Sequence, residues 1–128
     1  MKQILLLILS GMLFSWAAQA QGGKAEPNRI EFAIGRTSVT LAGTLSNAEE
    51  MEYVFRAGKG QKVTLKMATP NLFDYRVFNP DADFETEFDS STTSSFELPA
   101  DGDYFLFIRK KMVKQPRKAK YRLVVAIK

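Results

Sequence analysis

The chain has 128 residues, a formal net charge of +4, and neither histidine nor cysteine. Without these two residue types, Ser-His and Cys-His nucleophilic catalysis, disulfide cross-links and most zinc sites are excluded. A pair of carboxylates, as in glycosidases, could still catalyse a reaction, but nothing in the sequence pairs two of them. We therefore expect a protein that is not an enzyme, uses no cofactor and holds no metal ion, and its mild positive charge alone does not indicate nucleic acid.

Residues 1–20 have the pattern of a cleavable secretory signal peptide. Lys2 supplies the positive charge of the n-region, and a largely apolar run extends from Ile4 to Trp16. Ala18-Gln19-Ala20 has the small-x-small form of a cleavage site. A membrane span needs about 20 continuous apolar residues, and no stretch of this chain is that long. We predict Sec-type export with cleavage near Ala20, a periplasmic or secreted protein, and no membrane span.

The remaining chain divides into a short lead-in and one domain. Residues 21–28 are small and polar, which is typical of a flexible amino-terminal segment. Residues 29–128 are enough for one ordinary domain and not for two.

Alternation of apolar and polar residues within this domain predicts β-strands that each have one buried face. The residues expected to point into the core are Val39, Leu41, Gly43 and Leu45, then Met51, Tyr53 and Phe55, then Val63, Leu65 and Met67, and finally Tyr121, Leu123, Val125 and Ile127. Two runs, Leu72 to Phe78 and Tyr104 to Ile108, carry aromatic residues on both faces, so we expect central strands covered on both sides. About seven to eight short strands separated by turn residues indicate an all-β fold, an antiparallel β-sandwich in a single domain.

Acidic residues alternate along one connecting segment, at Asp81, Asp83, Glu85, Glu87 and Asp89. A calcium-binding EF-hand loop that began at Asp81 would need glycine and glutamate where Thr86 and Thr92 stand. The favoured interpretation is an exposed strand or loop whose acidic side chains point to solvent while Phe84 and Phe88 pack inward.

A basic cluster without any acid lies near the carboxyl terminus. Its members are Arg109, Lys110, Lys111, Lys114, Arg117, Lys118 and Lys120. The cluster could bind an anionic polymer such as lipopolysaccharide, or it could be the solvated surface of a hairpin. Because its loop holds no aromatic residue for base stacking, we do not expect a nucleic-acid partner.

The segment from Glu97 to Tyr104 is a turn that leads into an aromatic strand. Pro99 restricts φ and Gly102 accepts a positive φ, so a tight turn explains the residues. The pattern Leu98-Pro99-Ala100-x-Gly102-x-Tyr104 resembles the hallmark of bacterial pre-peptidase C-terminal domains, which are β-sandwiches.

Nearly the whole mature chain more closely resembles the periplasmic inhibitors of g-type lysozyme. The matching residues are Ile30 to Phe32, Gly35, Gly43, Tyr53 to Ala57, Lys59 to Val63, Leu98-Pro99-Ala100, Gly102, Tyr104, Arg117-Lys118, Tyr121, Ile127 and Lys128.

This resemblance implies a protein that occludes the active-site cleft of a lysozyme with its loops, using a Ser-Gly-x-Tyr motif at the tip. By position, the candidate partner-binding residues are Asp101, Gly102, Asp103 and Tyr104, with Lys111, Lys114 and Arg117 as neighbouring contacts. Asp101 departs from the motif serine: a hydroxyl can donate to a catalytic carboxylate, whereas an ionised aspartate only accepts and would be repelled. Tyr104 could equally be a core residue that anchors its strand.

Two functions remain open at this point. The first is a monomeric lysozyme inhibitor, with a g-type enzyme as the expected target. The second is a non-catalytic module that binds peptidoglycan or an anionic polymer of the envelope. The only tryptophan, Trp16, is lost with the signal peptide, which weakens the case for an aromatic sugar platform.

Overall fold

The structure is a computed structural model that describes residues 28–32 and 34–128. The predicted signal peptide and residues 21–27 of the predicted lead-in lie outside the described residues. The first strand, β1 (Asn28–Arg29), begins at the last residue assigned to the lead-in.

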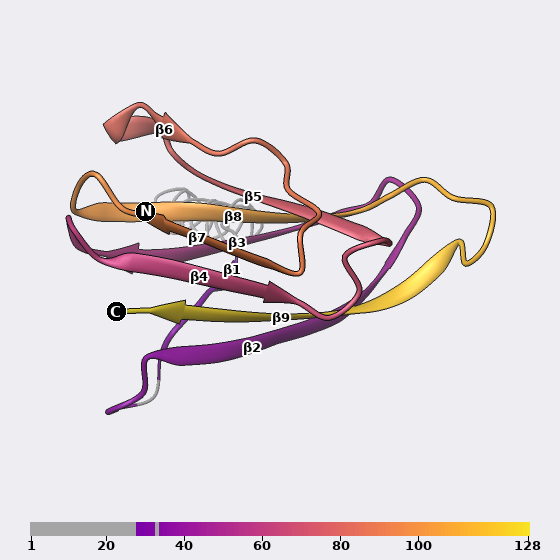
Figure 1. The fold of residues 1–128 in the computed structure, drawn as a ribbon, viewed down its shortest axis with the longest axis horizontal. Coiled ribbons are helices and arrows are strands. Elements are labelled where there is room, and N and C mark those ends of the chain that lie inside the picture. The colour runs from indigo at the N-terminus through magenta and orange to yellow at the C-terminus, as the bar shows by residue number, and fades with distance from the viewer. Residues whose placement is uncertain (1–27, 33) are drawn as a thin grey trace, which may run out of the picture.

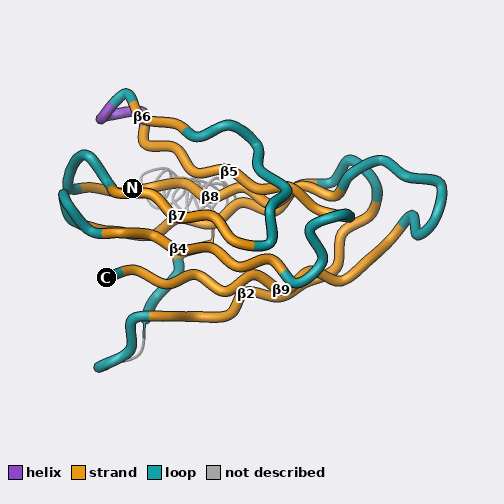
Figure 2. Tube along the Cα trace, in the orientation of Figure 1, coloured by secondary structure: helices purple, strands orange, loops and turns teal. Residues whose placement is uncertain are grey.

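Two β-sheets pack face to face (Figures 1 and 2). The five-stranded sheet has the order β1-β3-β8-β5-β6, with β3 (Glu50–Ala57), β8 (Gly102–Lys110), β5 (Phe73–Asn79) and β6 (Phe84–Glu85). The four-stranded sheet has the order β2-β9-β4-β7, with β2 (Ser38–Ser46), β9 (Lys118–Ile127), β4 (Lys62–Met67) and β7 (Thr93–Glu97). A single helical turn, η1 (Pro80–Ala82), follows β5.

The predicted antiparallel β-sandwich is confirmed. Every strand pairing is antiparallel except the short parallel pairing of β1 with β3. The described residues form nine strands, more than predicted, because β1 and β6 are only two residues long and too short to show alternation.

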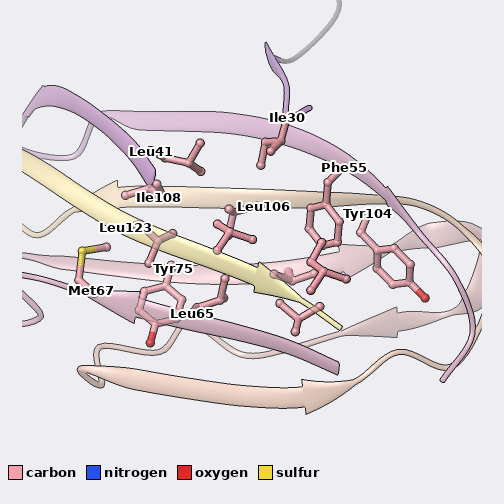
Figure 3. Packing of buried hydrophobic residues seen from close by; sticks show 14 of the residues in the cluster. Ile30, Leu41, Phe55, Leu65, Met67, Tyr75, Tyr104, Leu106, Ile108 and Leu123 are labelled. Carbon is pink, nitrogen blue, oxygen red and sulfur yellow. The ribbon is translucent and has the colours of Figure 1, made fainter. Parts of the chain in front are cut away.

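The core lies between the two sheets and is built from the alternating residues (Figure 3). Along β4, Val63, Leu65 and Met67 are buried while Lys62 and Lys66 are exposed, as the pattern predicts. Strand β9 places Tyr121, Leu123, Val125 and Ile127 in the core in the same way, and β2 contributes Leu41 and Leu45. Period-two hydrophobicity therefore decides which face of each strand is buried.

The prediction that both faces of the aromatic strands are covered is wrong. Strand β8 is central, because it pairs with β3 on one side and β5 on the other. Its inner residues Leu106 and Ile108 are fully buried, but Phe105 and Phe107 on the outer face remain half-buried. No layer of described strands covers this face, so the outer rings pack against one another and against arginine side chains.

Candidate partner-binding surfaces

The turn before β8 is built around a buried tyrosine. The Tyr104 side chain has no exposed area, and its ring stacks on Phe55 with the centroids 5.6 Å apart. Its hydroxyl donates a hydrogen bond of 2.7 Å to the carbonyl oxygen of Ala100, and this bond fixes the turn to the core. Gly102 has a φ of +145°, a conformation that residues with a Cβ rarely adopt, so the turn requires glycine there.

Asp101 joins this turn to the neighbouring turn between β3 and β4. Its Oδ1 accepts a hydrogen bond of 2.7 Å from the backbone N–H of Lys59. The backbone N–H of Gly60 in turn donates to the carbonyl oxygen of Leu98 at 2.9 Å. Residues 58–61 and 98–101 therefore form one linked unit, which we call the turn end.

Asp103 points away from the tip, onto the outer face of the five-stranded sheet. Two nitrogens of the Arg29 guanidinium donate to its carboxylate at 3.2 and 3.3 Å, and Arg56 lies 3.8 Å from it. The hydrogen bond from Arg29 holds the pKa of Asp103 below its usual range. This carboxylate is thus engaged by arginines of its own chain.

The four candidate residues of the turn therefore occupy four different environments. Asp101 is exposed at the tip, Gly102 shapes the turn, and Asp103 lies on a sheet face. Tyr104 cannot contact a partner in this conformation because its side chain is fully buried. The structure places Tyr104 in the core, which was the other interpretation of this residue.

The connection between β8 and β9 is anchored by a buried lysine. The Lys110 side chain has no exposed area, and its Nζ donates to Asn47 Oδ1 at 2.8 Å and to the carbonyl oxygen of Lys111 at 2.9 Å. Asn47 Nδ2 also donates to the carbonyl oxygen of Val113 at 2.7 Å. We call residues 47–49 and 111–117 the loop end.

Among the candidate residues of the loop end, Lys114 and Arg117 are exposed and Lys111 is half-buried. Met112 beside them is 76% exposed, an unusual value for a large apolar side chain. A hollow lined by Asn47, Met112, Val113, Lys114, Gln115 and Arg117 opens on this surface.

The two groups of candidate residues lie at opposite ends of the sandwich. Asp101 directly precedes β8 and Lys111 directly follows it, so the whole nine-residue strand separates them. At about 3.3 Å per residue, the ten steps from Asp101 to Lys111 span roughly 33 Å. Figure 1 shows the β8–β9 connection projecting at the right and the β7–β8 turn at the left.

The structure also divides the basic cluster. Arg109 faces outward on the five-stranded sheet, where its Nε and Nη2 donate to the Asp74 carboxylate at 3.1 and 2.9 Å. Lys110 is buried, and Lys118 and Lys120 are exposed on β9 of the other sheet. Adjacent charges in the sequence separate because neighbouring residues of a strand point to opposite faces.

A cluster of aromatic rings and arginines that the sequence pattern does not predict lies on the outer face of the five-stranded sheet. The rings of Phe78 and Phe105 stack with centroids 5.2 Å apart. The Arg76 guanidinium lies 5.1 Å from the Phe78 centroid and 5.6 Å from that of Phe107. Arg109 lies 3.7 Å above Phe88, so this ring belongs to the outer face and not to the core, contrary to expectation.

The alternating acids between β5 and β7 do not gather into a metal-binding group. Within residues 28–32 and 34–128, no three potential ligand side chains converge. Asp81, Asp83, Glu85 and Glu87 are exposed, whereas Asp89 is half-buried and accepts a hydrogen bond from the Ser91 backbone. In the same part of the chain no helix is long and apolar enough to cross a membrane.

Comparison with known proteins finds its matches in structure alone. No protein-family model matches the sequence, and no curated protein matches it. The periplasmic g-type lysozyme inhibitor PliG of Salmonella Typhimurium is similar with a TM-score of 0.69 and 25% identity, covering 81% of this chain and 100% of PliG.

Two further inhibitors of this kind have TM-scores of 0.65. A mutant of Escherichia coli PliG is 26% identical and covers 80% of this chain and 97% of its own. Aeromonas hydrophila PliG is 25% identical, with 80% and 96% covered. The pre-peptidase C-terminal domain of a Bacillus anthracis collagenase shares the fold, with a TM-score of 0.55 and 14% identity. The resemblance derived from the sequence is therefore confirmed in three dimensions, and the three similar proteins with TM-scores of 0.65 to 0.69 are inhibitors and not enzymes.

Proposed function

We propose that this protein is an inhibitor of lysozyme, that its target is a g-type enzyme, and that it acts by placing the turn end in the active-site cleft. The observation that carries the proposal is the shared sandwich: about a quarter of the residues are identical to those of three PliG inhibitors, over almost the full length of each. We further propose that the protein acts as a monomer in the periplasm or outside the cell, after cleavage near Ala20.

The construction of the turn end supports its role as the inserted element. The hydrogen bonds from the Lys59 backbone N–H to Asp101 and from the Tyr104 hydroxyl to the Ala100 carbonyl oxygen fix both turns before a partner arrives. A rigid segment loses little conformational entropy on binding, and this preorganisation raises affinity. Pro99, Asp101 and the Lys59 side chain are exposed there and available for contact.

The surroundings of Asp101 support the proposal that an aspartate can stand at the position of the motif serine. The Asp101 carboxylate accepts a backbone N–H of its own chain, so it is directed at the β3–β4 turn. The exposed Lys59 side chain adds a positive charge to the same tip. An ammonium group beside a catalytic carboxylate is attracted to it, which offsets the repulsion expected from aspartate.

Purified mature protein mixed with g-, i- and c-type lysozymes provides the direct test, with lysis of cell walls as the readout. We expect lysis by the g-type enzyme to fall in proportion to added protein, without turnover and through an interface of about 1,600 Å². Undiminished lysis by all three enzymes would overturn the inhibitor function, and inhibition of another type alone would overturn the g-type target.

Two substitutions of Asp101 test the inserted turn within the same assay. Asp101→Asn keeps an oxygen acceptor for Lys59 and removes the charge, so inhibition should be retained or strengthened. Asp101→Ala removes the acceptor and loosens the turn, so inhibition should weaken by roughly tenfold. Lys120→Ala, which changes an exposed lysine on β9, is the control and should change little; equal inhibition by all variants contradicts insertion of the turn end.

A further inference from the structure

The outer face of the four-stranded sheet carries a row of exposed cations that the sequence does not show as a unit. Strand β9 contributes Lys118, Lys120 and Arg122, and the adjacent strand β4 contributes Lys62 and Lys66. All five side chains are exposed. We call these residues the cationic stripe; β4 and β9 lie side by side in Figure 1.

Strand pairing gives the stripe its length and spacing. Alternate residues on one strand are about 7 Å apart, and neighbouring strands are separated by about 4.8 Å. Lys66 pairs with Val124, the next outward position after Arg122, so the stripe continues from β9 onto β4. It ends at Lys62, whose backbone exchanges hydrogen bonds with Lys128 at the end of β9. The stripe thus follows the whole length of β9.

These cations have no ionic partner in the described part of the chain. The four ion pairs there all involve arginines on the five-stranded sheet: Arg29, Arg56, Arg76 and Arg109. On the outward positions of β2, β9, β4 and β7, the single acid is Glu97, opposite Lys62 at one edge. The stripe is therefore a concentrated positive charge on a molecule whose net charge is modest.

Hydroxyl groups accompany the cations on the same face. Thr40 and Thr44 of β2 are exposed beside β9, and Thr64 and Ser95 contact each other at 2.8 Å beyond it. A hollow lined by Thr44, Thr69, Lys120 and Arg122, among others, adjoins the stripe. The buried Oγ1 of Thr69 has no hydrogen-bond partner among the described residues.

We propose that the cationic stripe binds an extended anionic polysaccharide, with the lysines and Arg122 on its acidic groups and the threonine hydroxyls on its sugar hydroxyls. Charge complementarity supports this ligand class because repeated anions can contact successive cations along one strand. The outward positions of these four strands hold no aromatic side chain, and proteins that bind single-stranded nucleic acid rely on such rings.

Retention on immobilised heparin, a linear anionic polysaccharide, tests the proposal without any lysozyme. The test variant is the triple substitution Lys66→Gln, Lys120→Gln and Arg122→Gln. We expect the unchanged protein to bind at low ionic strength and to elute with moderate salt, because salt screens exposed charges. The triple variant should bind heparin roughly tenfold more weakly, the sum of three exposed charge contacts.

A matched control removes three exposed cations elsewhere: Arg36→Gln, Lys59→Gln and Arg56→Gln. It has the same net charge as the triple variant and should bind heparin within about threefold of the unchanged protein. An equal loss of heparin binding in both variants would show that only the net charge matters, and it would overturn the stripe as the binding site. No retention at low salt, or tighter binding of a single-stranded DNA oligomer of equal charge, would overturn the ligand class.

Discussion

Asp101 and Tyr104 lie three residues apart and stabilise the same turn in different ways. The Asp101 carboxylate accepts a hydrogen bond of 2.7 Å from the Lys59 backbone in the neighbouring turn. The buried Tyr104 hydroxyl donates one of the same length to the carbonyl oxygen of Ala100 in its own turn. A motif that combines a polar residue, glycine and tyrosine can therefore be a device for building a rigid turn. Only the polar residue of the three offers its side chain to solvent.

At the residue scale, substitutions of Tyr104 separate a core role from a contact role. Tyr104→Ala removes a buried ring and should lower the free energy of unfolding by about 3–5 kcal/mol. Tyr104→Phe keeps the stacking on Phe55 and removes only the hydroxyl, so it should cost about 1 kcal/mol. Urea denaturation measures both values, and a Tyr104→Ala variant of unchanged stability would contradict the core role.

At the element scale, strand β8 connects the turn end with the loop end. Its first residues complete the turn end, its outer face carries Phe105 and Phe107, and its last residue, Lys110, reaches into the loop end. A lysine at this buried position is unusual, because a buried ammonium must have hydrogen-bond acceptors. Asn47 and the Lys111 carbonyl supply them, so the loop is held by the strand that precedes it.

Replacing Lys110 tests this anchoring. Lys110→Met keeps an apolar stem of similar length but leaves Asn47 Oδ1 and the Lys111 carbonyl oxygen without the ammonium donor. Amide hydrogen exchange at residues 111–117 should accelerate roughly tenfold, while the core strands keep their protection. Lys114→Met removes the same charge from an exposed position and is the control; similar exchange in both variants would contradict the anchor.

At the scale of the whole molecule, the two outer sheet faces differ in chemistry. The outer face of the five-stranded sheet holds phenylalanine rings and arginines that are paired with acids. The outer face of the four-stranded sheet holds hydroxyls and cations that have no ionic partner among the described residues. The turn end belongs to neither face, which leaves room for separate partners.

This separation predicts independent effects on the two proposed activities. The triple variant of Lys66, Lys120 and Arg122 should inhibit lysozyme within about twofold of the unchanged protein, because distant sites act additively. Asp101→Ala should weaken inhibition and leave heparin retention intact. Lysozyme inhibition and heparin retention are both measured for both variants. Loss of the two activities together in either variant would contradict separate binding surfaces.

The fold could be predicted because its signals are local. Alternation along β2, β3, β4 and β9 identifies the buried side of each strand, since a side chain's face depends only on its position in the pleat. The prediction for the aromatic strands was wrong, because outward-facing residues such as Phe105 and Phe107 look the same in the sequence as residues of a covered face. The Arg76 side chain and the other rings pack on these two residues, and no local pattern in the sequence predicts those contacts.

The candidate site could be predicted only in part, for a related reason. The position of the turn follows from Pro99 and Gly102, which restrict or free the backbone locally. Whether Tyr104 faces solvent depends on the register of β8 against β3, where it pairs with Phe55. The members of the basic cluster are close in sequence, but the alternation of faces along β8 places Arg109 and Lys110 in different environments.

By itself, the sequence determined the all-β class, the inward residues of each strand and the glycine-dependent turn, because these follow from backbone geometry over a few residues. The tertiary structure decided everything that depends on which strands are neighbours. Pairing of β4 with β9 joins Lys66 to Arg122 in one stripe, and packing of two turns places Asp101 on Lys59. These contacts form between residues far apart in the chain, and only strand order and register bring them together.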